Sequence, residues 1–563
     1  MASIRGYWDQ KKAKVAGVTF GIVFLLASFG FAGPARGDDE RGASGNDCPT
    51  SLSTEPTCNR YLAQGPWAGS HRSSYAQGSS PLAAPRSAAG LDSDRTSVPG
   101  VPTTYGFSGE YDDGGRILWM SPVGTTNTVV KLDAKSLETL DSYVPRLRED
   151  NPPAVSPGIS GAYNLVDVDN RFIVARGRSV EVYGDAEDGV RTSGISLITR
   201  FNLPASAFCG TSDSVVGMAM TYDGHLALVS ERGVVSTVPR KPVDMLIQNV
   251  TSHSINPEDC ASQQISNSLS IDESGGLYIV ASDAMYRIDW DGNGLVQRWR
   301  SAYESGVAQP GIRLGSGSGS TPSLMGTQAN DDRFVVLTDG QPLMHLVLMW
   351  RDEIPDGWEP IGPGKDPRIA CEIPIRFGDP DATESLSEQS VLVRGSSAVV
   401  VNNRLTGAKV APFLPAIAQN LSSVLQGGLP NVAPYGIERV DWNPATRTCE
   451  SVWANPEISI PNAIPTMSET TGLIYAHGQQ NGVWGLEAVD FVTGERRFFA
   501  PAPDPTCRES TVSLRSMDKL VATYAFFKYP GSCQNSAYAA ATVGPDGALY
   551  QGTLFGMTRY GSN

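Results

Sequence analysis

Five polar residues stand just ahead of short apolar segments of this sequence, and their side chains carry oxygen atoms that can bind a ligand. They are Asn267, Thr321, Glu388, Gln389 and Asn462. Carboxylate and amide oxygens suit a hard cation such as Ca²⁺. We therefore predict a ligand-binding site at these five residues, with a calcium site at Asn267, Glu388 and Asn462. The alternative is that the asparagines cap turns, as asparagine commonly does at strand starts.

A general base is the second chemical group to consider, and His477 is the best placed of the five histidines. It follows the apolar residues 473–476, where a loop could present the imidazole to a substrate. A hydrogen-bonded turn histidine explains the same pattern. The sequence contains no GxSxG, HExxH, phosphate-loop or dinucleotide motif, so it does not decide whether the protein is an enzyme.

Asp289, Asp291 and Asn293 match the first half of an EF-hand calcium loop. The twelfth position of that loop should be a bidentate Glu, and here it is Arg300. A hairpin turn explains the Asp-Gly-Asn-Gly stretch better, because such turns need residues that tolerate positive φ.

The elements that position these residues are short strands. Residues 266–300, SNSLSIDESGGLYIVASDAMYRIDWDGNGLVQRWR, read as four strands joined by three tight turns. One such sheet leaves both faces bare and needs similar neighbours to cover them. Comparable units recur from Gly115 to Tyr560. We predict an all-β fold, a single β-propeller of four-stranded antiparallel blades, with eight blades favoured and seven the alternative.

In a propeller the innermost strands begin around a central channel, and the five polar residues would converge there. We expect the segment near Tyr105 to supply a missing strand to the last blade. Such closure protects the strand edges of the ring.

Three regions are predicted along the chain. Residues 1–35 read as a signal peptide, with a basic start and an uncharged apolar run over 15–32. An uncleaved membrane anchor is the alternative, because about 17–25 apolar residues span a bilayer. Residues 36–104, rich in Gly, Ser and Pro, read as a linker. Residues 105–563 form the propeller.

Eight cysteines fit an exported chain, periplasmic or secreted, because disulfides persist in oxidising compartments. No two of them form a CxxC pair. Pairing neighbours along the chain predicts the bridges Cys48–Cys58, Cys209–Cys260, Cys371–Cys449 and Cys507–Cys533. This is one of 105 connectivities that eight cysteines allow.

The net charge of −15 argues against a nucleic-acid partner, whose phosphates would be repelled. Membrane contact is expected only if the apolar run near the N-terminus is not cleaved. The partner is otherwise open, a small molecule or a protein.

Several segments resemble those of known propeller families. Residues 132–136 (LDAKS) and 489–494 (VDFVTG) resemble outer hairpins of quinoprotein-like propellers. Residues 267–280 (NSLSIDESGGLYIV) and 540–552 (AATVGPDGALYQG) resemble inner strand pairs of NHL and regucalcin-like propellers. These are generic blade motifs, and they imply the fold more than an activity.

The regucalcin and paraoxonase resemblance implies that an Asn ahead of an inner strand holds a catalytic calcium, and Asn267 and Asn462 match that place. The quinoprotein resemblance would imply bound pyrroloquinoline quinone (PQQ). The adjacent Cys pair of many such enzymes is absent and the tryptophan docking motifs are poor, so the sequence argues against PQQ.

Taken together, these patterns predict an exported β-propeller that binds a ligand or partner at its central channel or rim. A calcium-dependent hydrolase, a lactonase or esterase, is the first alternative. A PQQ-type oxidoreductase is the second.

Overall fold

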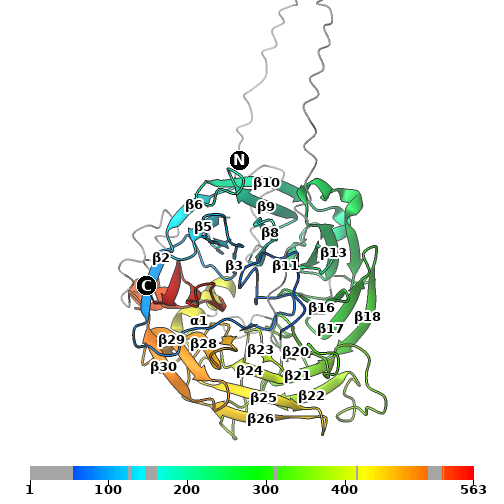
Figure 1. The fold of residues 1–563 in the computed structure, drawn as a ribbon. Helices are drawn as coiled ribbons and strands as arrows, with labels where there is room; N and C mark the ends of the chain where they lie inside the picture. Colours follow the sequence, from blue (N-terminus) through cyan, green and yellow to red (C-terminus); the bar gives the residue numbers. More distant parts are fainter. Residues whose placement is uncertain are drawn as a thin grey trace, which may run out of the picture. The chain divides into compact units, whose positions relative to one another are not determined.

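Eight β-sheets surround one axis in the computed structural model of this chain (Figure 1). Seven sheets have four strands and one has five, and sequential strands within each sheet are antiparallel. The prediction of an all-β, eight-bladed propeller is confirmed. The structure describes residues 55–124, 128–145, 162–260, 262–307, 315–411, 413, 416–504, 507, 523 and 525–562.

In blades one to six the strands are consecutive and the first strand is innermost, whereas the seventh and eighth blades each include one strand from the N-terminal side of β3. The strands of blades one to four are β3 (Tyr105–Phe107), β4 (Ile117–Met120), β5 (Val129–Asp133), β6 (Thr139–Tyr143), β7 (Asn164–Val166), β8 (Phe172–Arg176), β9 (Ser179–Asp185), β10 (Ile195–Asn202), β11 (Val215–Met220), β12 (His225–Ser230), β13 (Val234–Pro239), β14 (Thr251–Ser254), β15 (Ser270–Ile271), β16 (Gly276–Val280), β17 (Ala284–Trp290) and β18 (Leu295–Ala302). The strands of blades five to eight are β19 (Ser323–Met325), β20 (Phe334–Thr338), β21 (His345–Trp350), β22 (Ile369–Pro374), β23 (Leu392–Arg394), β24 (Ser397–Val401), β25 (Ile437–Asn443), β26 (Thr448–Asn455), β27 (Thr466–Ser468), β28 (Leu473–Gln480), β29 (Val483–Asp490), β30 (Arg496–Pro501), β31 (Ala541–Val543), β32 (Leu549–Thr553) and β33 (Gly556–Gly561).

The burial of the strands follows from this arrangement. Second strands such as β16 and β20 are buried at every residue, because neighbouring blades cover both faces. Their sequences are accordingly near-continuous apolar runs. The outermost strand β18 is mostly exposed and carries polar residues. The core therefore consists of apolar clusters between neighbouring blades, such as the one that joins Val229 of β12 to Leu277 of β16.

The predicted meander at residues 266–300 is confirmed as the fourth blade, β15–β18. In its first turn the Asp272 carboxylate accepts hydrogen bonds from the amides of Ser274 and Gly276, each at 2.9 Å. Gly275 takes φ +89°, which side chains disfavour. In its last turn Asp291 accepts hydrogen bonds from the amides of the next turn residues, at 2.8–2.9 Å. The hairpin interpretation of this stretch agrees with these bonds.

The ring is closed by a strand that precedes the first blade. β2 (Asp92–Ser97) pairs antiparallel with β33 and becomes the outermost strand of the eighth blade. The expectation that the segment near Tyr105 would supply this strand is wrong. Residues 105–107 form β3, the innermost strand of the first blade, and all three residues are buried.

Residues 55–80, here called the plug, lie inside the ring (dark blue in Figure 1). The carbonyl oxygens of residues 67–78 accept hydrogen bonds of 2.7–3.3 Å from one amide in each of six blades, those of Phe107, Val166, Ile271, Leu324, Val393 and Met467. The plug ends in β1 (Ser79–Ser80), which pairs parallel with β27 of the seventh blade.

The plug and β2 differ from the linker predicted over residues 36–104, of which the structure describes residues 55–104. Trp67 and Tyr75 are almost fully buried. The small residues that suggested a linker instead allow close approach. A Cβ atom at Gly65 would lie 2.8 Å from the carbonyl oxygen of Phe107, and one at Gly69 would lie 3.1 Å from Leu165 Cβ.

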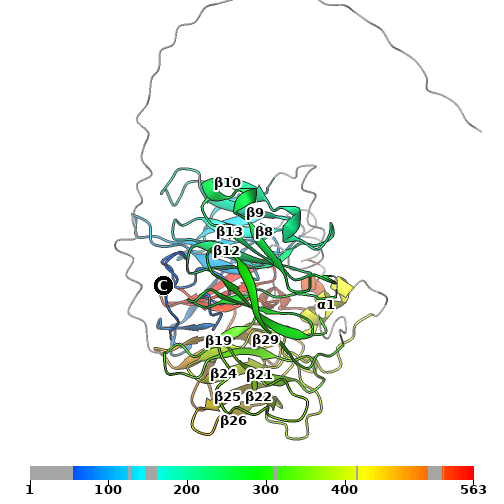
Figure 2. The same ribbon diagram turned by 90° about the vertical axis from the view of Figure 1, so that its right-hand side faces the viewer.

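The two faces of the ring carry different structures. We call the face on which the innermost strands begin the start face. Antiparallel strands also place there the loops between second and third strands, as well as the connections to the next blade. The helix α1 (Ala416–Gln426) belongs to the β24–β25 loop and lies at one side of the ring in Figure 2.

Three disulfides join neighbouring parts of the ring. Cys209–Cys260, Cys371–Cys449 and Cys507–Cys533 are present, as predicted. The fourth predicted bridge involves Cys48, which lies outside the described residues, as does the predicted signal peptide. Among the described residues, no helix has the length and apolar character needed to cross a membrane.

Candidate functional site

The five predicted channel residues all stand within a few positions of the start of an innermost strand, and all are buried. The Asn267 side-chain amide donates to the carbonyl oxygen of Ser318 at 3.1 Å. The Thr321 amide donates to Ser390 Oγ at 3.1 Å. The neighbouring Ser320 hydroxyl donates to the carbonyl oxygen of Gln389 at 2.7 Å. These bonds bring the starts of blades four, five and six together.

The remaining two residues have other partners. The Glu388 backbone amide donates a hydrogen bond to Asn403 Oδ1 at 2.7 Å. The Asn462 amide donates to Asn535 Oδ1 at 3.0 Å and lies 3.4 Å from the carbonyl oxygen of Val424 in α1. Asn462 thus joins the helix to the ring. The calcium site at Asn267, Glu388 and Asn462 stays a prediction.

His477, the predicted general base, is fully buried inside β28. Its Nε2 lies 2.6 Å from the Tyr560 hydroxyl, and burial lowers the pKa of the imidazole to about 3. The structure thus differs from the prediction, because β28 continues to Gln480 where a turn was expected. An imidazole enclosed between the seventh and eighth blades has no access to a substrate.

The plug brings His71 into the channel. Its Nε2 lies 3.3 Å from Ser390 Oγ, and burial lowers the pKa of the imidazole to about 4. Two cavities beside the plug measure about 30 and about 10 Å³. Such volumes hold one or two water molecules at most. The residues on this part of the axis therefore do not fit PQQ.

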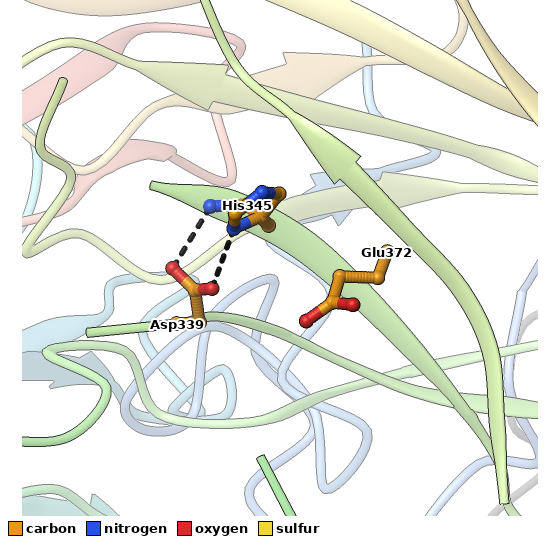
Figure 3. Close-up of side chains that lie close together, drawn as sticks. All are labelled: Asp339, His345 and Glu372. Carbon is orange, nitrogen blue, oxygen red and sulfur yellow. Dashed lines mark hydrogen bonds and ion pairs between the residues drawn. The ribbon is translucent and has the colours of Figure 1, made fainter. Parts of the chain in front are cut away.

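A different cluster lies on the start face of the fifth blade, where Asp339, His345 and Glu372 come together (Figure 3). Asp339 directly follows β20, His345 begins β21, and Glu372 lies in β22. The strand register pairs Glu372 with Val347, two residues beyond His345, so Glu372 and His345 share one face of the sheet. One ligand atom from each of the three lies within 4.8 Å of the others.

Hydrogen bonds fix the geometry of this cluster. His345 Nδ1 lies 2.7 Å from Asp339 Oδ2, and the His345 amide donates to Asp339 Oδ1 at 2.8 Å. The bond to Asp339 raises the pKa of the imidazole above its usual value. Lys365 Nζ lies 2.6 Å from Glu372 Oε2 and 3.3 Å from Glu304 Oε1. The second oxygen of Glu372 is buried and accepts no hydrogen bond among the described residues.

Sequence reasoning missed this cluster. Asp339 and His345 flank a recognisable hairpin turn, but Glu372 follows a long loop that carries no motif. Only the register between β21 and β22 shows that the three residues meet.

The fold and these sites define an eight-bladed β-propeller whose channel is occupied by its own N-terminal segment. The chain belongs to the same family as an uncharacterized protein of Archaeoglobus fulgidus. The two are 42% identical over 511 residues, which cover 91% of this chain and 90% of that protein. No family model matches the chain.

Solved structures with a similar course of the chain are also propellers or contain them. A europium-containing methanol dehydrogenase is 11% identical, with a TM-score of 0.48, over 87% of this chain and 90% of its own. The Dos1 propeller is 10% identical, with a TM-score of 0.44, over 84% and 95%. Dihydro-heme d1 dehydrogenase NirN is 10% identical, with a TM-score of 0.42, over 72% and 66%. At such values we draw no conclusion about activity from these likenesses.

Proposed function

We propose that this protein is exported and binds a protein partner on its start face, outside the channel and without catalysing a reaction. The plug is the observation that carries the proposal. Its backbone is hydrogen-bonded to six blades, so the axis where many propellers bind small ligands is already taken by this chain. A binding surface is then to be sought on the rim.

Export is supported by the three disulfides, because thiols of cytosolic proteins are kept reduced in most organisms. The acidic composition agrees with a partner other than nucleic acid.

The start face carries the two most exposed large apolar side chains among the described residues, and a protein partner would cover them. Phe413, in the same loop as α1, is 85% exposed, and Phe527, between β30 and β31, is 87% exposed. The adjacent Phe526 is buried against Leu425, so the segment that presents Phe527 is anchored to the helix. Large exposed aromatic side chains on anchored loops are typical of interaction surfaces.

The calcium-dependent hydrolase has less support. The side-chain NH2 groups of Asn267 and Asn462 donate to different protein groups, Ser318 and Asn535, so their bonds are explained by packing of the inner strands without a metal. The PQQ enzyme has less support still, because the cavities beside the plug are water-sized.

Photocrosslinking in the native host tests the partner. A photoreactive phenylalanine analogue replaces Phe527, and in a matched variant it replaces Val296, an exposed residue of the outer strand β18. We expect one protein adduct of defined mass from position 527 and none from position 296. Adducts at neither position, or the same mixture at both, would contradict a partner site on the start face.

A further inference from the structure

We propose that Asp339, His345 and Glu372 form a binding site for a divalent transition metal, with zinc the best match. This inference is independent of the protein partner and would hold if the start face bound nothing else. It rests on three observations: the convergence of the ligand atoms, the unused oxygen of Glu372, and the choice of ligand types.

The convergence is imposed by three neighbouring strands of one blade. The end of β20, the start of β21 and the middle of β22 belong to the same sheet, and the Asp339 amide donates to the carbonyl oxygen of His345 at 3.0 Å, so backbone hydrogen bonds hold the three residues in place. The ligand atoms lie within 4.8 Å of one another. Zinc ligands lie about 2.0–2.2 Å from the metal. Zinc would compete with the 2.7 Å hydrogen bond between His345 Nδ1 and Asp339 Oδ2, and small side-chain rotations would then bring the three ligands to that distance.

The unused oxygen is the observation that points to a ligand. The Glu372 side chain is only 7% exposed, and its Oε1 accepts no hydrogen bond among the described residues. Its carboxylate is directed toward Asp339 and His345 (Figure 3). A buried charged oxygen without a partner costs free energy, and a cation would remove that cost.

The charges agree with a cation site. Asp339 and Glu372 supply two negative charges. The ammonium group of Lys365, 2.6 Å from Glu372 Oε2, offsets one of them. Lys365 also contacts Glu304 at 3.3 Å, so its ammonium group keeps a partner when a metal takes up the other oxygen of Glu372.

The ligand types favour zinc over calcium. Imidazole with carboxylates suits zinc and related transition metals, whereas calcium takes six to eight oxygen ligands. Three protein ligands leave a coordination position for water or for a group of a bound molecule. The imidazole of His345 is about one-quarter exposed, so solvent reaches the site.

Zinc titration of the full chain, stripped of metal with a chelator, tests the site. We expect isothermal titration calorimetry and elemental analysis to give one zinc per chain, and calcium to give no saturable heat. His345→Ala and Glu372→Gln should each weaken zinc binding by about 100-fold, since changing even a residue that only orients a metal ligand costs about 10–100-fold in affinity.

His225→Ala is the matched control. His225 Nδ1 lies 3.2 Å from Asp223 Oδ1 on the third blade, so it forms a similar pair, but no third ligand joins it among the described residues. We expect its zinc affinity to stay within twofold of wild type. Near-ultraviolet circular dichroism verifies that each variant is folded. A wild type without stoichiometric zinc, or an equal loss in the folded His225→Ala variant, would overturn the proposal.

Discussion

His71 shows what a single side chain does when the channel is occupied from within. It has left-handed backbone geometry, φ +56°, and its buried imidazole meets the hydroxyl of Ser390. Burial alone depresses the pKa of this imidazole to about 4, so it stays neutral in the folded protein down to that pH. Histidine in an unfolded chain takes up its proton near pH 6.5.

This difference predicts a loss of stability in acid. As the pH falls below 6.5 the unfolded chain binds a proton that the folded chain refuses, so the free energy of unfolding falls until pH 4 is reached. His71 accounts for about 2.5 kcal/mol of that loss at pH 4.5. His71→Asn tolerates the same backbone geometry and does not titrate. We expect denaturant unfolding at pH 7 and 4.5 to give this variant a smaller acid loss by about that amount.

His477 provides an internal control for this measurement. It is also buried, with a pKa of about 3, and it is present in both proteins, so its effect cancels in the comparison. Equal acid losses in wild type and His71→Asn would show that the plug leaves the channel before His71 is protonated.

For single residues, the sequence predicted the position in the fold better than it predicted what the side chain contacts or does. Asn267, Thr321 and Asn462 stand ahead of inner strands as expected, because turn residues and apolar runs are local patterns. Their hydrogen-bond partners come from other blades, which no local pattern identifies. Glu372 was missed for the same reason, since its neighbours in the cluster are defined by strand register.

Individual strands and hairpins were the most predictable elements. The turns at Asp272 and Asp291 follow from side-chain bonds to amides two to four residues away, and those spacings are visible in the sequence. The helix α1 overlaps a segment whose apolar residues recur at helical spacing. It is an insertion between two strands, so the blade pattern itself continues around it.

The Cys371–Cys449 disulfide joins two elements of neighbouring blades, β22 and β26. It closes a loop with a sequence separation of 78 residues. Loss of that constraint should lower the free energy of unfolding by on the order of 4 kcal/mol, chiefly by freeing the unfolded chain.

The double variant Cys371→Ala, Cys449→Ala tests this estimate by denaturant unfolding without reductant. Reductant should lower the free energy of unfolding of the wild type toward that of the double variant. It will also reduce the other two described disulfides. A change below about 1 kcal/mol in the variant would show that packing alone holds these two blades together.

At the scale of the whole molecule, stability depends on the closure of the ring by β2. A proline at Thr96, which pairs with Met557 of β33, removes a backbone amide from this strand and restricts its backbone, whereas an alanine keeps the amide and adds no such restriction. Thr96→Pro should lower the free energy of unfolding by about 3 kcal/mol or more, and Thr96→Ala by less than about 1 kcal/mol.

Thermal unfolding, followed by circular dichroism, compares the melting temperatures of Thr96→Pro and Thr96→Ala with that of the wild type. Equal melting temperatures for the two variants would mean that the eighth blade holds without its outermost strand.

The plug and the closing strand could not be predicted from the sequence. The plug residues are mostly small and polar because they lie against backbone in a narrow space, and β2 is polar because it is an outermost strand that solvent reaches. The same composition is typical of linkers. Trp67 and Tyr75 are isolated anchors without a periodic neighbourhood, so they carried no signal of a buried segment.

The pairing of β2 with the last blade also sets the order of events as the chain is made. Arg95 donates a hydrogen bond to the carbonyl oxygen of Leu554, across a separation of 459 residues. β2 is therefore synthesised before any of the blades but stays without its partner strand until β33, the last strand of the domain, is made. Contacts so distant along the chain make folding slow. The blades also have to assemble around the plug, which precedes them in the chain, so the nascent protein is exposed to misassembly until β33 is made.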